Sequence, residues 1–147
     1  MDYVNVDITT VESGVILHGV NCQRAMNSGV ARSIRNKWPV VYDEFMTNSG
    51  GVQMLGHAQL VLVAPGLWVM NCFTQLYYGR DGRRYADVNA IDTALNHSFR
   101  FMGYNGVTAH LPKIGCGLGG LSWEDEVLPI IEMYASTYDV PTTIYTI

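Results

Sequence analysis

The chain has 147 residues and a formal net charge of −4, with 48% hydrophobic and 15% charged residues. This balance predicts one globular domain with a sizeable core, excludes a disordered chain, and argues against an extended nucleic-acid-binding face, which needs a basic surface. The three cysteines are an odd number without CxxC spacing, which favours a reducing compartment and gives no signal for a metal site.

The first part of the chain predicts two strands followed by two helical segments. Residues 3–8 alternate with period two, and residues 14–20 form a nearly continuous apolar run, typical of a strand buried on both faces. After a polar loop, the apolar side chains of residues 30–38 recur at helical spacing. Pro39 should end or kink this helix, and residues 40–46 should form a further helical turn.

Two strands and a long loop are predicted next. Residues 60–63 and 67–73 have the apolar character of strands, and Ala64-Pro65-Gly66 should turn the chain between them. The following loop, residues 76–84, contains Tyr77, Tyr78, Arg80, Arg83 and Arg84. These side chains can close over a phosphorylated ligand, but an exposed loop is the simpler explanation of the pattern.

A long amphipathic helix is predicted to follow this loop, with Gly103 as its C-cap. Its apolar residues recur every three or four positions, at Val88, Ile91, Leu95, Phe99 and Met102. A strand at 107–111, a helix at 123–138 and a last strand at 142–147 complete the chain. Strands alternating with helices predict an α/β fold with a mixed central sheet and helices on both faces.

The sequence predicts a cytoplasmic protein without a membrane partner. The N-terminus lacks a basic segment followed by a long apolar run, so no signal peptide is expected. The longest apolar stretch, residues 60–70, is interrupted by Pro65-Gly66 and is too short to span a bilayer.

Two glycine-containing loops each follow a strand and precede a helix. Both should open at the carboxyl-end edge of the sheet, where α/β folds bind ligands. The segment GCGLGG, residues 115–120, can present several backbone N–H groups to an anion, but a tight strand-to-helix corner explains the glycines equally well. The loop AMNSGVA, residues 25–31, is open to the same two explanations. The pair of loops favours a diphosphate ligand.

Four side chains near the strand ends are candidates for function, and each has a structural alternative. Asp7 can accept a hydrogen bond from an exocyclic amine such as that of adenine, or cap a turn. Asn21 can hold sugar hydroxyls or form an Asx turn. His18 lies within a strand, where a histidine is more often a hydrogen-bonded core residue than a catalyst. Cys116 has no evident partner base, which favours packing over nucleophilic attack.

Four segments, in order along nearly the whole chain, resemble a macrodomain: VDIT, ILHGVNC…AMNSGVA, LPKIGCGLGGLSWED and the C-terminal TIYTI. Within that family, GCGLGGLSW resembles the branch of the terminal ADP-ribose protein glycohydrolase, the DNA ADP-ribosyl glycohydrolase antitoxins and the yeast ADP-ribose-1″-phosphate phosphatase. The resemblance implies a three-layer α/β/α fold that binds ADP-ribose.

The resemblance also implies a position for each part of ADP-ribose. Asp7 and Ile8 would hold adenine, and Asn21 would hold the distal ribose. The implied diphosphate-binding residues are Met26, Ser28, Gly29, Val30, Gly115, Cys116, Gly117, Leu118 and Gly119. Glycine would let backbone N–H groups reach the diphosphate without a clash from Cβ, and a positive φ is expected at Gly117.

The chain departs from the glycohydrolases of this branch at two positions. Those enzymes carry a nucleophilic lysine at the end of the strand before the variable loop, and an assisting aspartate in the glycine loop. Here Phe73, Thr74 and Gln75 occupy the strand end, and Gly119 stands where the aspartate would be. Covalent catalysis by lysine is therefore not expected.

The phosphatases of this branch lack the lysine and aspartate and keep an HxxNC segment, which is matched here by His18 to Cys22. The resemblance therefore favours a metal-free phosphatase that converts ADP-ribose-1″-phosphate to ADP-ribose and phosphate, with His18 and Asn21 as its catalytic residues and no cofactor. Two alternatives stay open. One is a glycohydrolase that uses water to remove ADP-ribose from protein or nucleic acid, and the other is a catalytically silent ADP-ribose-binding module.

Overall fold

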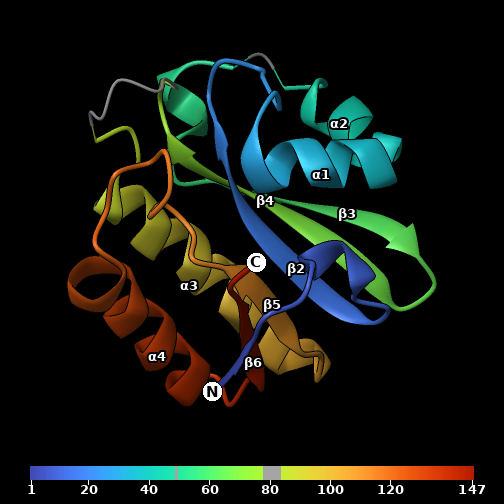
Figure 1. Cartoon of the computed structure of the whole chain (residues 1–147), viewed down its shortest axis with the longest axis vertical. Coiled ribbons are helices and arrows are strands. Elements are labelled where there is room, and N and C mark those ends of the chain that lie inside the picture. Colours follow the sequence, from blue (N-terminus) through green and yellow to red (C-terminus); the bar gives the residue numbers. More distant parts are fainter. Residues whose placement is uncertain (49, 78–83) are drawn as a thin grey trace.

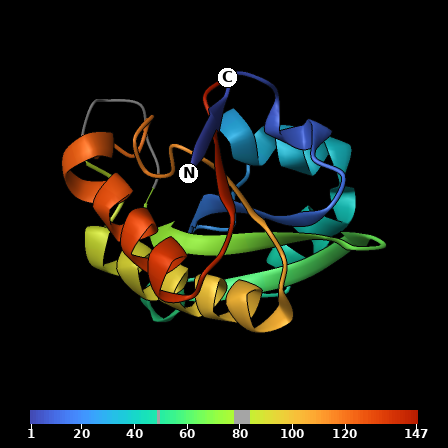
Figure 2. The same ribbon diagram turned by 90° about the horizontal axis from the view of Figure 1, so that it is seen from below.

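The computed structural model of the chain describes residues 1–48, 50–77 and 84–147, and it shows a six-stranded sheet between two layers of helices (Figures 1 and 2). The strand order is β1-β6-β5-β2-β4-β3. Neighbouring strands are parallel except for the antiparallel pair of β3 and β4. The predicted three-layer α/β/α fold with a mixed sheet is confirmed.

Strands and helices alternate along the described chain. The strands are β1 (Asp2–Val4), β2 (Gly14–Asn21), β3 (Ala58–Ala64), β4 (Leu67–Gln75), β5 (Ala109–Pro112) and β6 (Thr142–Tyr145). The α-helices are α1 (Gly29–Lys37), α2 (Pro39–Phe45), α3 (Val88–Asn105) and α4 (Leu128–Thr137). Three shorter turns are the 3-10 turns η1 (Ile8–Thr10) and η2 (Val52–Met54) and the π-helical turn η3 (Trp123–Val127).

The central strand β2 is buried on both faces, as its apolar sequence predicts. Val15 and Leu17 belong to the core cluster formed with α3 and α4. Ile16 and Val20 belong to the other cluster, formed with α1 and α2. Because side chains alternate along a strand, β2 supplies apolar residues to both layers and separates the two cores.

The N-terminal strand is shorter than predicted. It ends at Val4, and Asp7 caps η1 instead of extending the strand to Ile8. The Asp7 Oδ1 atom accepts hydrogen bonds from the Thr9 backbone N–H at 2.9 Å and the Thr9 hydroxyl at 2.8 Å. A side chain that bonds the backbone two residues further on favours a turn over a strand, which the period-two pattern did not reveal.

The predicted C-cap of α3 was wrong by three residues. The helix continues to Asn105, and its C-cap is Gly106, whose φ of 65° lies in the left-handed region that favours glycine. Gly103 lies inside the helix, where α4 ends against it. A Cβ atom built on Gly103 would lie 2.5 Å from the Tyr138 backbone oxygen. Glycine is needed there for the close approach of two chains.

The last three elements differ from their predictions only at the ends. β5 begins at Ala109 instead of residue 107, and β6 ends at Tyr145 instead of residue 147. The predicted helix over 123–138 begins with the π-helical turn η3 before α4. Pro129 lacks the N–H that would continue a regular α-helical bond pattern through this junction.

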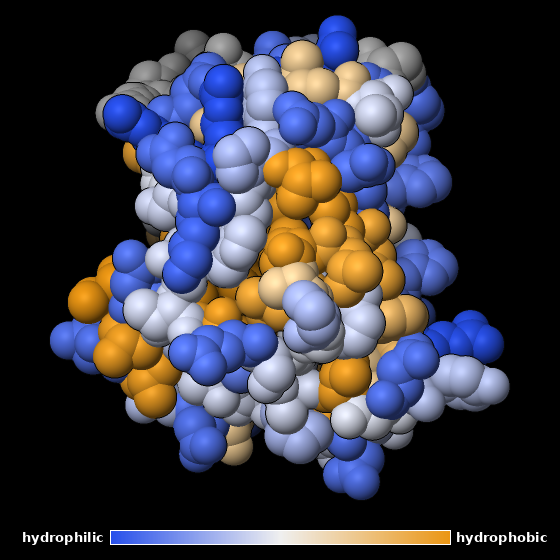
Figure 3. Space-filling model, turned by 90° about the vertical axis from the view of Figure 1, so that its right-hand side faces the viewer, coloured by the Kyte–Doolittle hydropathy of each residue, from blue (hydrophilic) through white to orange (hydrophobic). Residues whose placement is uncertain are grey.

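Strand β3 forms one edge of the sheet and leaves apolar side chains exposed. Leu60 and Leu62 are 38% and 58% exposed, and β3 contains no charged residue. Figure 3 shows apolar surface on the side of the molecule where the β3–β4 hairpin lies in Figure 1. No helix in the described part of the chain is both long and apolar enough to cross a membrane.

Replacing Gly103 by alanine should destabilise the protein, although alanine is the better helix former. The new methyl group would collide with the Tyr138 backbone, so one helix must shift, at a cost of about 1–3 kcal/mol. Chemical denaturation measures this loss of unfolding free energy. The control is Tyr104→Ala at a neighbouring position that is 92% exposed, where a change below about 0.5 kcal/mol is expected. Equal stability of Gly103→Ala and wild type would contradict the packing argument.

Candidate functional site

The three central strands end at the same edge of the sheet. β5, β2 and β4 are parallel neighbours, so Pro112, Asn21 and Gln75 lie at one rim. The chain leaves β2 toward α1 on one face and leaves β5 toward α4 on the other face (Figure 2). Neighbouring strands whose connections diverge in this way open a crevice between the two loops.

A cavity of about 430 Å³ lies at this rim. Its lining comes from the end of β2 and the following loop, from the end of β4, and from the glycine loop after β5. The lining residues are 18–21, 25–31, 74–75, 112–115 and 117–119. The structure therefore brings together the two loops that the sequence singled out.

The glycine loop presents free hydrogen-bond donors. The backbone N–H groups of Gly117, Leu118 and Gly119 donate to no acceptor in the described part of the chain, whereas the flanking N–H groups of Cys116 and Leu121 bond to carbonyls of the loop itself. Successive unpaired N–H groups in one loop form a concave site for an anion.

The first turn of α1 presents a second set of donors to the same cavity. The N-cap residue Ser28 makes no side-chain capping bond, so the N–H groups of Gly29, Val30 and Ala31 have no acceptor within the described residues. Gly29 has a φ of 61°, which only glycine adopts readily, and a Cβ there would meet no atom within 4 Å. The helix dipole adds to the attraction for an anion.

The glycines of residues 115–120 serve two different purposes. Gly119 serves packing, because a Cβ there would lie 2.6 Å from the Gly115 oxygen and 2.9 Å from the Ala86 Cβ. No aspartate fits at that position without a shift of the loop. Gly117 has open space where its Cβ would be. The expected positive φ at Gly117 is wrong, because Gly117 lies outside the left-handed region.

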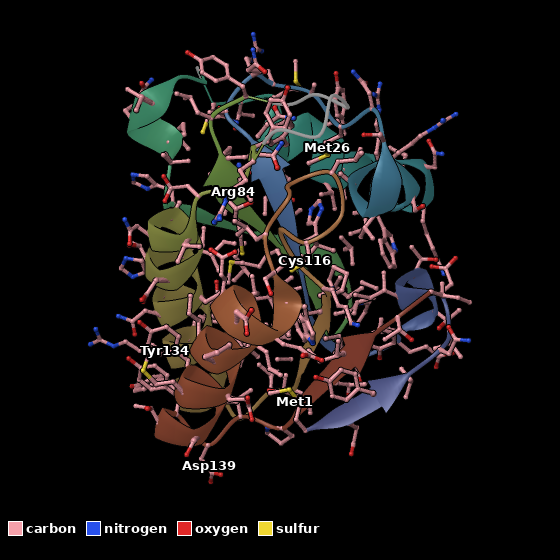
Figure 4. All side chains as sticks on the ribbon, turned by 60° about the vertical axis from the view of Figure 1, so that its left-hand side comes forward. Met1, Met26, Arg84, Cys116, Tyr134 and Asp139 are labelled. Carbon is pink, nitrogen blue, oxygen red and sulfur yellow. The ribbon has the colours of Figure 1, made fainter. Side chains whose placement is uncertain are left out.

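Cys116 faces away from the cavity. Its side chain packs against the core formed with α3 and α4, and its thiol donates to the Ile114 oxygen at 3.3 Å. Burial raises the pKa of the Cys116 thiol to about 11, so the thiol is protonated at neutral pH. Its backbone N–H is also engaged, with the Lys113 oxygen. Figure 4 shows Cys116 and Met26 on the two different loops, and only Met26 lines the cavity.

Asp7 lies in a second, adjoining cavity of about 300 Å³. Ile8, Ser33 and Ile147 line it with Asp7, and Gly29 and Val30 line both cavities. The hydrogen bonds from Thr9 lower the pKa of Asp7, so its carboxylate is ionised. Its Oδ1 atom is occupied by those bonds, whereas Oδ2 has no partner in the described part of the chain.

The C-terminal Ile147 is a residue of this second cavity that sequence reasoning missed. A terminal apolar residue carries no signal of its own. Its position follows from the pairing of β6 with β1, which brings the end of the chain beside Asp7 and Ile8.

Asn21 forms the Asx turn that was one of its two interpretations. Its Oδ1 atom accepts the Gln23 and Ala25 N–H groups at 3.0 and 3.3 Å, and its Nδ2 atom donates to the Ala25 oxygen at 2.9 Å. The Asn21 side chain thus holds the loop that begins at the end of β2. Its amide keeps one N–H for a ligand, and the residue lines the larger cavity.

His18 combines a core position with an unused hydrogen-bonding atom. It is 1% exposed and lies in the wall of the larger cavity. Its Nε2 atom is 2.5 Å from the Asn71 Oδ1 atom, and its Nδ1 atom has no partner in the described part of the chain. Burial lowers the pKa of His18 to about 4, so the imidazole is neutral at pH 7.

Three further residues complete the cavity. Lys113 is the charged side chain among its described lining residues, and its Nζ atom lies 5.8 Å from the centre of the Trp123 ring. Thr74 and Gln75 line the cavity where the glycohydrolase resemblance would require a lysine. Sequence analysis did not identify Lys113, and a lysine two residues before the glycine loop is the signal that could have pointed to it.

Most of the predicted arginine-rich loop lies outside the described residues, including Tyr78, Arg80 and Arg83. Tyr77 is 59% exposed and does not line either cavity. Arg84 forms an ion pair with Glu126 of η3 and lines neither cavity.

The chain is similar to proteins of phage and bacteria, although no protein-family model matches it. It is 28% identical over 148 residues to an uncharacterised 17.5 kDa protein of Enterobacteria phage T4, covering 94% of this chain and 92% of that protein. A macrodomain protein from Streptomyces coelicolor is 27% identical and superposes with a TM-score of 0.77 over 99% of this chain and 98% of that chain.

A third comparison concerns a protein solved with a ligand. Thermosipho africanus DarTG in complex with ADP-ribose superposes with a TM-score of 0.71 at 20% identity. The match covers 92% of this chain and 38% of that chain, so it shows a common fold in part of a longer protein.

The resemblance carried by four sequence segments therefore agrees with the three-dimensional comparison. The fold of the S. coelicolor macrodomain protein extends over nearly the whole of both chains. On these grounds the chain has the fold of a macrodomain.

Proposed function

We propose that this protein binds ADP-ribose and releases phosphate from ADP-ribose-1″-phosphate. The observation that carries the proposal is the presence of two sets of unpaired backbone N–H groups, at residues 29–31 and 117–119, around one cavity. A diphosphate is a ligand with acceptor oxygens on two sides, and it matches two such sets better than a single anion does. The ADP-ribose bound to the similarly folded DarTG supports this choice of ligand.

The two cavities provide room for the two ends of the ligand. Gly29 and Val30 line both, so a diphosphate held there continues into each cavity. The adenine amino group would donate to the free Oδ2 atom of Asp7, against the apolar side chain of Ile8. The distal ribose would lie in the larger cavity, beside the remaining N–H of Asn21.

The proposed reaction is hydrolysis at phosphorus. The Nδ1 atom of His18 has no partner in the described part of the chain and is buried in the cavity wall, so the ring must shift to expose it. A water molecule then gives a proton to Nδ1, and the water oxygen attacks the terminal phosphate. The bond between phosphorus and the 1″ oxygen breaks, and the proton passes to that oxygen. The products are ADP-ribose and inorganic phosphate. The positive charge of Lys113 beside the cavity attracts the terminal phosphate.

The cavity lacks the lysine that the glycohydrolases of the resembling branch carry at the end of the strand that corresponds to β4. Thr74 and Gln75 stand at the end of β4, and the packing around Gly119 leaves no space for an assisting carboxylate. Removal of ADP-ribose from acidic side chains by that route is therefore not expected.

Asp7→Asn should change which base the protein prefers. Asparagine can keep the cap on Thr9 through its oxygen, but its amide N–H₂ would face the amino group of adenine, donor against donor. We expect ADP-ribose binding to weaken by about 1.5–3 kcal/mol. Binding of IDP-ribose, whose base carries an acceptor oxygen, should weaken less or improve. Calorimetry with both ligands measures the change, and an unaltered preference would remove Asp7 from the base site.

Gly117→Val should abolish ADP-ribose binding and leave stability near that of the wild type. The φ of Gly117 is accessible to any residue, and its Cβ position is open, so the new side chain extends into unoccupied space beside the N–H groups. Gly117→Ala, which adds one methyl group, should give an intermediate loss. Calorimetry and thermal unfolding separate binding from stability. Normal binding by a folded Gly117→Val protein would mean that this loop does not contact the ligand.

Purified protein should release phosphate from ADP-ribose-1″-phosphate, and EDTA should not slow the release. The described lining of the cavity has no carboxylate or thiolate to hold a metal ion. Asn21→Ala should lose about a hundredfold in rate while binding ADP-ribose more nearly normally, because small misplacements of a reacting group are costly. His18→Gln keeps an N–H for Asn71 but has no basic nitrogen, and it should also be slow.

Malachite-green detection of phosphate measures the rates, and calorimetry with ADP-ribose measures the affinities of the same variants. If the protein ignored the 1″-phosphate but stripped ADP-ribose from modified protein or DNA, the phosphatase proposal would be wrong and the glycohydrolase alternative would replace it. Binding without either activity would identify a silent binding module.

A further inference from the structure

A chain of hydrogen bonds connects His18 to the end of α2. The His18 Nε2 atom is 2.5 Å from the Asn71 Oδ1 atom, and the Asn71 Nδ2 atom donates to the Gln59 Oε1 atom at 3.1 Å. The Gln59 Nε2 atom in turn donates to the Glu44 backbone oxygen at 2.8 Å. The three side chains are cross-strand neighbours on β2, β4 and β3, because His18 pairs with Asn71 and Asn71 pairs with Gln59.

The last member of the chain sets the direction of every bond. The Glu44 carbonyl oxygen can only accept, so the Gln59 amide must turn its N–H₂ toward it and its oxygen toward Asn71. Asn71 must then direct its N–H₂ toward Gln59 and its oxygen toward His18. That oxygen needs a donor, so the hydrogen of the imidazole lies on Nε2.

The opposite arrangement fails at the same carbonyl. Reversing Asn71 would place its N–H₂ against His18 and its oxygen against the Gln59 oxygen, which would have to reverse as well. The Gln59 oxygen would then face the Glu44 carbonyl oxygen, two acceptors without a hydrogen between them. The Glu44 carbonyl oxygen at the end of α2, three hydrogen bonds from His18, therefore determines which ring nitrogen of His18 carries the hydrogen.

The burial of His18 and Asn71 fixes the direction of these hydrogen bonds. Asn71 is 0% exposed and His18 is 1% exposed, so neither can exchange its partner for water without opening the sheet. Burial also keeps the imidazole neutral at pH 7, so it carries one hydrogen and exists as one of two tautomers.

We propose that Asn71 and Gln59 are positioning residues that hold His18 as the Nε2–H tautomer, so that Nδ1, buried in the wall of the cavity, keeps a bare lone pair. The unpartnered Nδ1 atom of a histidine that lines the cavity is the observation behind this assignment. The inference deepens the proposed function. The tautomer itself follows from the hydrogen bonds, and only the role of His18 toward the ligand rests on the proposed function.

The tautomer decides which class of group His18 can meet. A bare Nδ1 atom accepts a hydrogen bond from a sugar hydroxyl or from a water molecule, and it can take the proton of that water. It repels a phosphate oxygen, which is also an acceptor. The other tautomer would do the reverse, donating to a phosphate oxygen and leaving no base for water. The hydrogen-bond chain thus assigns His18 to the nucleophilic water or a ribose hydroxyl and not to the phosphate itself.

Nitrogen-15 NMR of the histidine rings tests the tautomer directly, because a ring nitrogen with a hydrogen and one without differ widely in chemical shift. The chain has four histidines, and the signals that disappear in His18→Gln belong to His18. Wild-type protein should show the hydrogen on Nε2 and a bare Nδ1. In Gln59→Leu the Asn71 amide loses its fixed acceptor and can reverse, so a mixture of both tautomers is expected. Gln59 is half-buried on the edge strand β3, where leucine is readily accommodated.

Leu60→Ala is the matched control, at the next position of the same strand and outside the hydrogen-bond chain, and it should leave the His18 signals unchanged. In the phosphate-release assay, Gln59→Leu should lower kcat severalfold with little change in KM, although Gln59 lines neither cavity. A hydrogen on Nδ1 in wild-type protein, or an unchanged single tautomer in Gln59→Leu, would overturn the inference. Because the NMR result needs no turnover, an inactive protein with the Nε2–H tautomer would contradict the proposed phosphatase activity and leave this inference standing.

Discussion

The burial of β2 on both faces is the constraint on which the rest of the structure depends. With one core on each side, its neighbours β5 and β4 run parallel to it, and their connections must return over the faces of the sheet. The loop after β2 therefore turns toward α1, and the loop after β5 turns toward α4. The crevice between these loops is a consequence of covering two apolar faces, and the cavity of the candidate site occupies it.

Packing and binding divide the glycine loop between them. Gly115 and Gly119 are surrounded by atoms of the loop and of α3, so side chains are excluded there for reasons internal to the fold. The same close packing leaves the N–H groups of residues 117–119 without internal acceptors. Because these backbone N–H groups have no acceptor within the loop, they are available to an anion. A ligand that covered them without accepting their hydrogen bonds would bind less well, since unpaired buried donors cost free energy. Stability and ligand binding thus depend on one arrangement.

His18 and Asn71, two polar residues in the middle of the sheet, show how hydrogen bonds offset the free-energy cost of burying polar groups. His18 and Asn71 lie on the face that also buries Ile16, Val20 and Phe73, where unpaired polar atoms are expensive. The Asn71 amide oxygen accepts from His18 and one Asn71 N–H donates to Gln59, whereas the Nδ1 atom of His18 has no partner in the described part of the chain. An unsatisfied acceptor that survives in such a network marks the place where a ligand or a water molecule belongs.

The sequence by itself determined the order of strands and helices, the double-sided burial of residues 14–20 and the two glycine loops at one rim, because hydrophobic periodicity and turn residues act over a few neighbours. It also indicated Asp7, His18 and Asn21, but as residues with two interpretations each. Only the tertiary structure gave the surroundings of the buried positions, since the neighbours of His18, of Gly103 and of Gly119 come from distant segments: Asn71, Tyr138 and Ala86. Steric exclusion and hydrogen-bond direction are set by such contacts, and no local pattern records them.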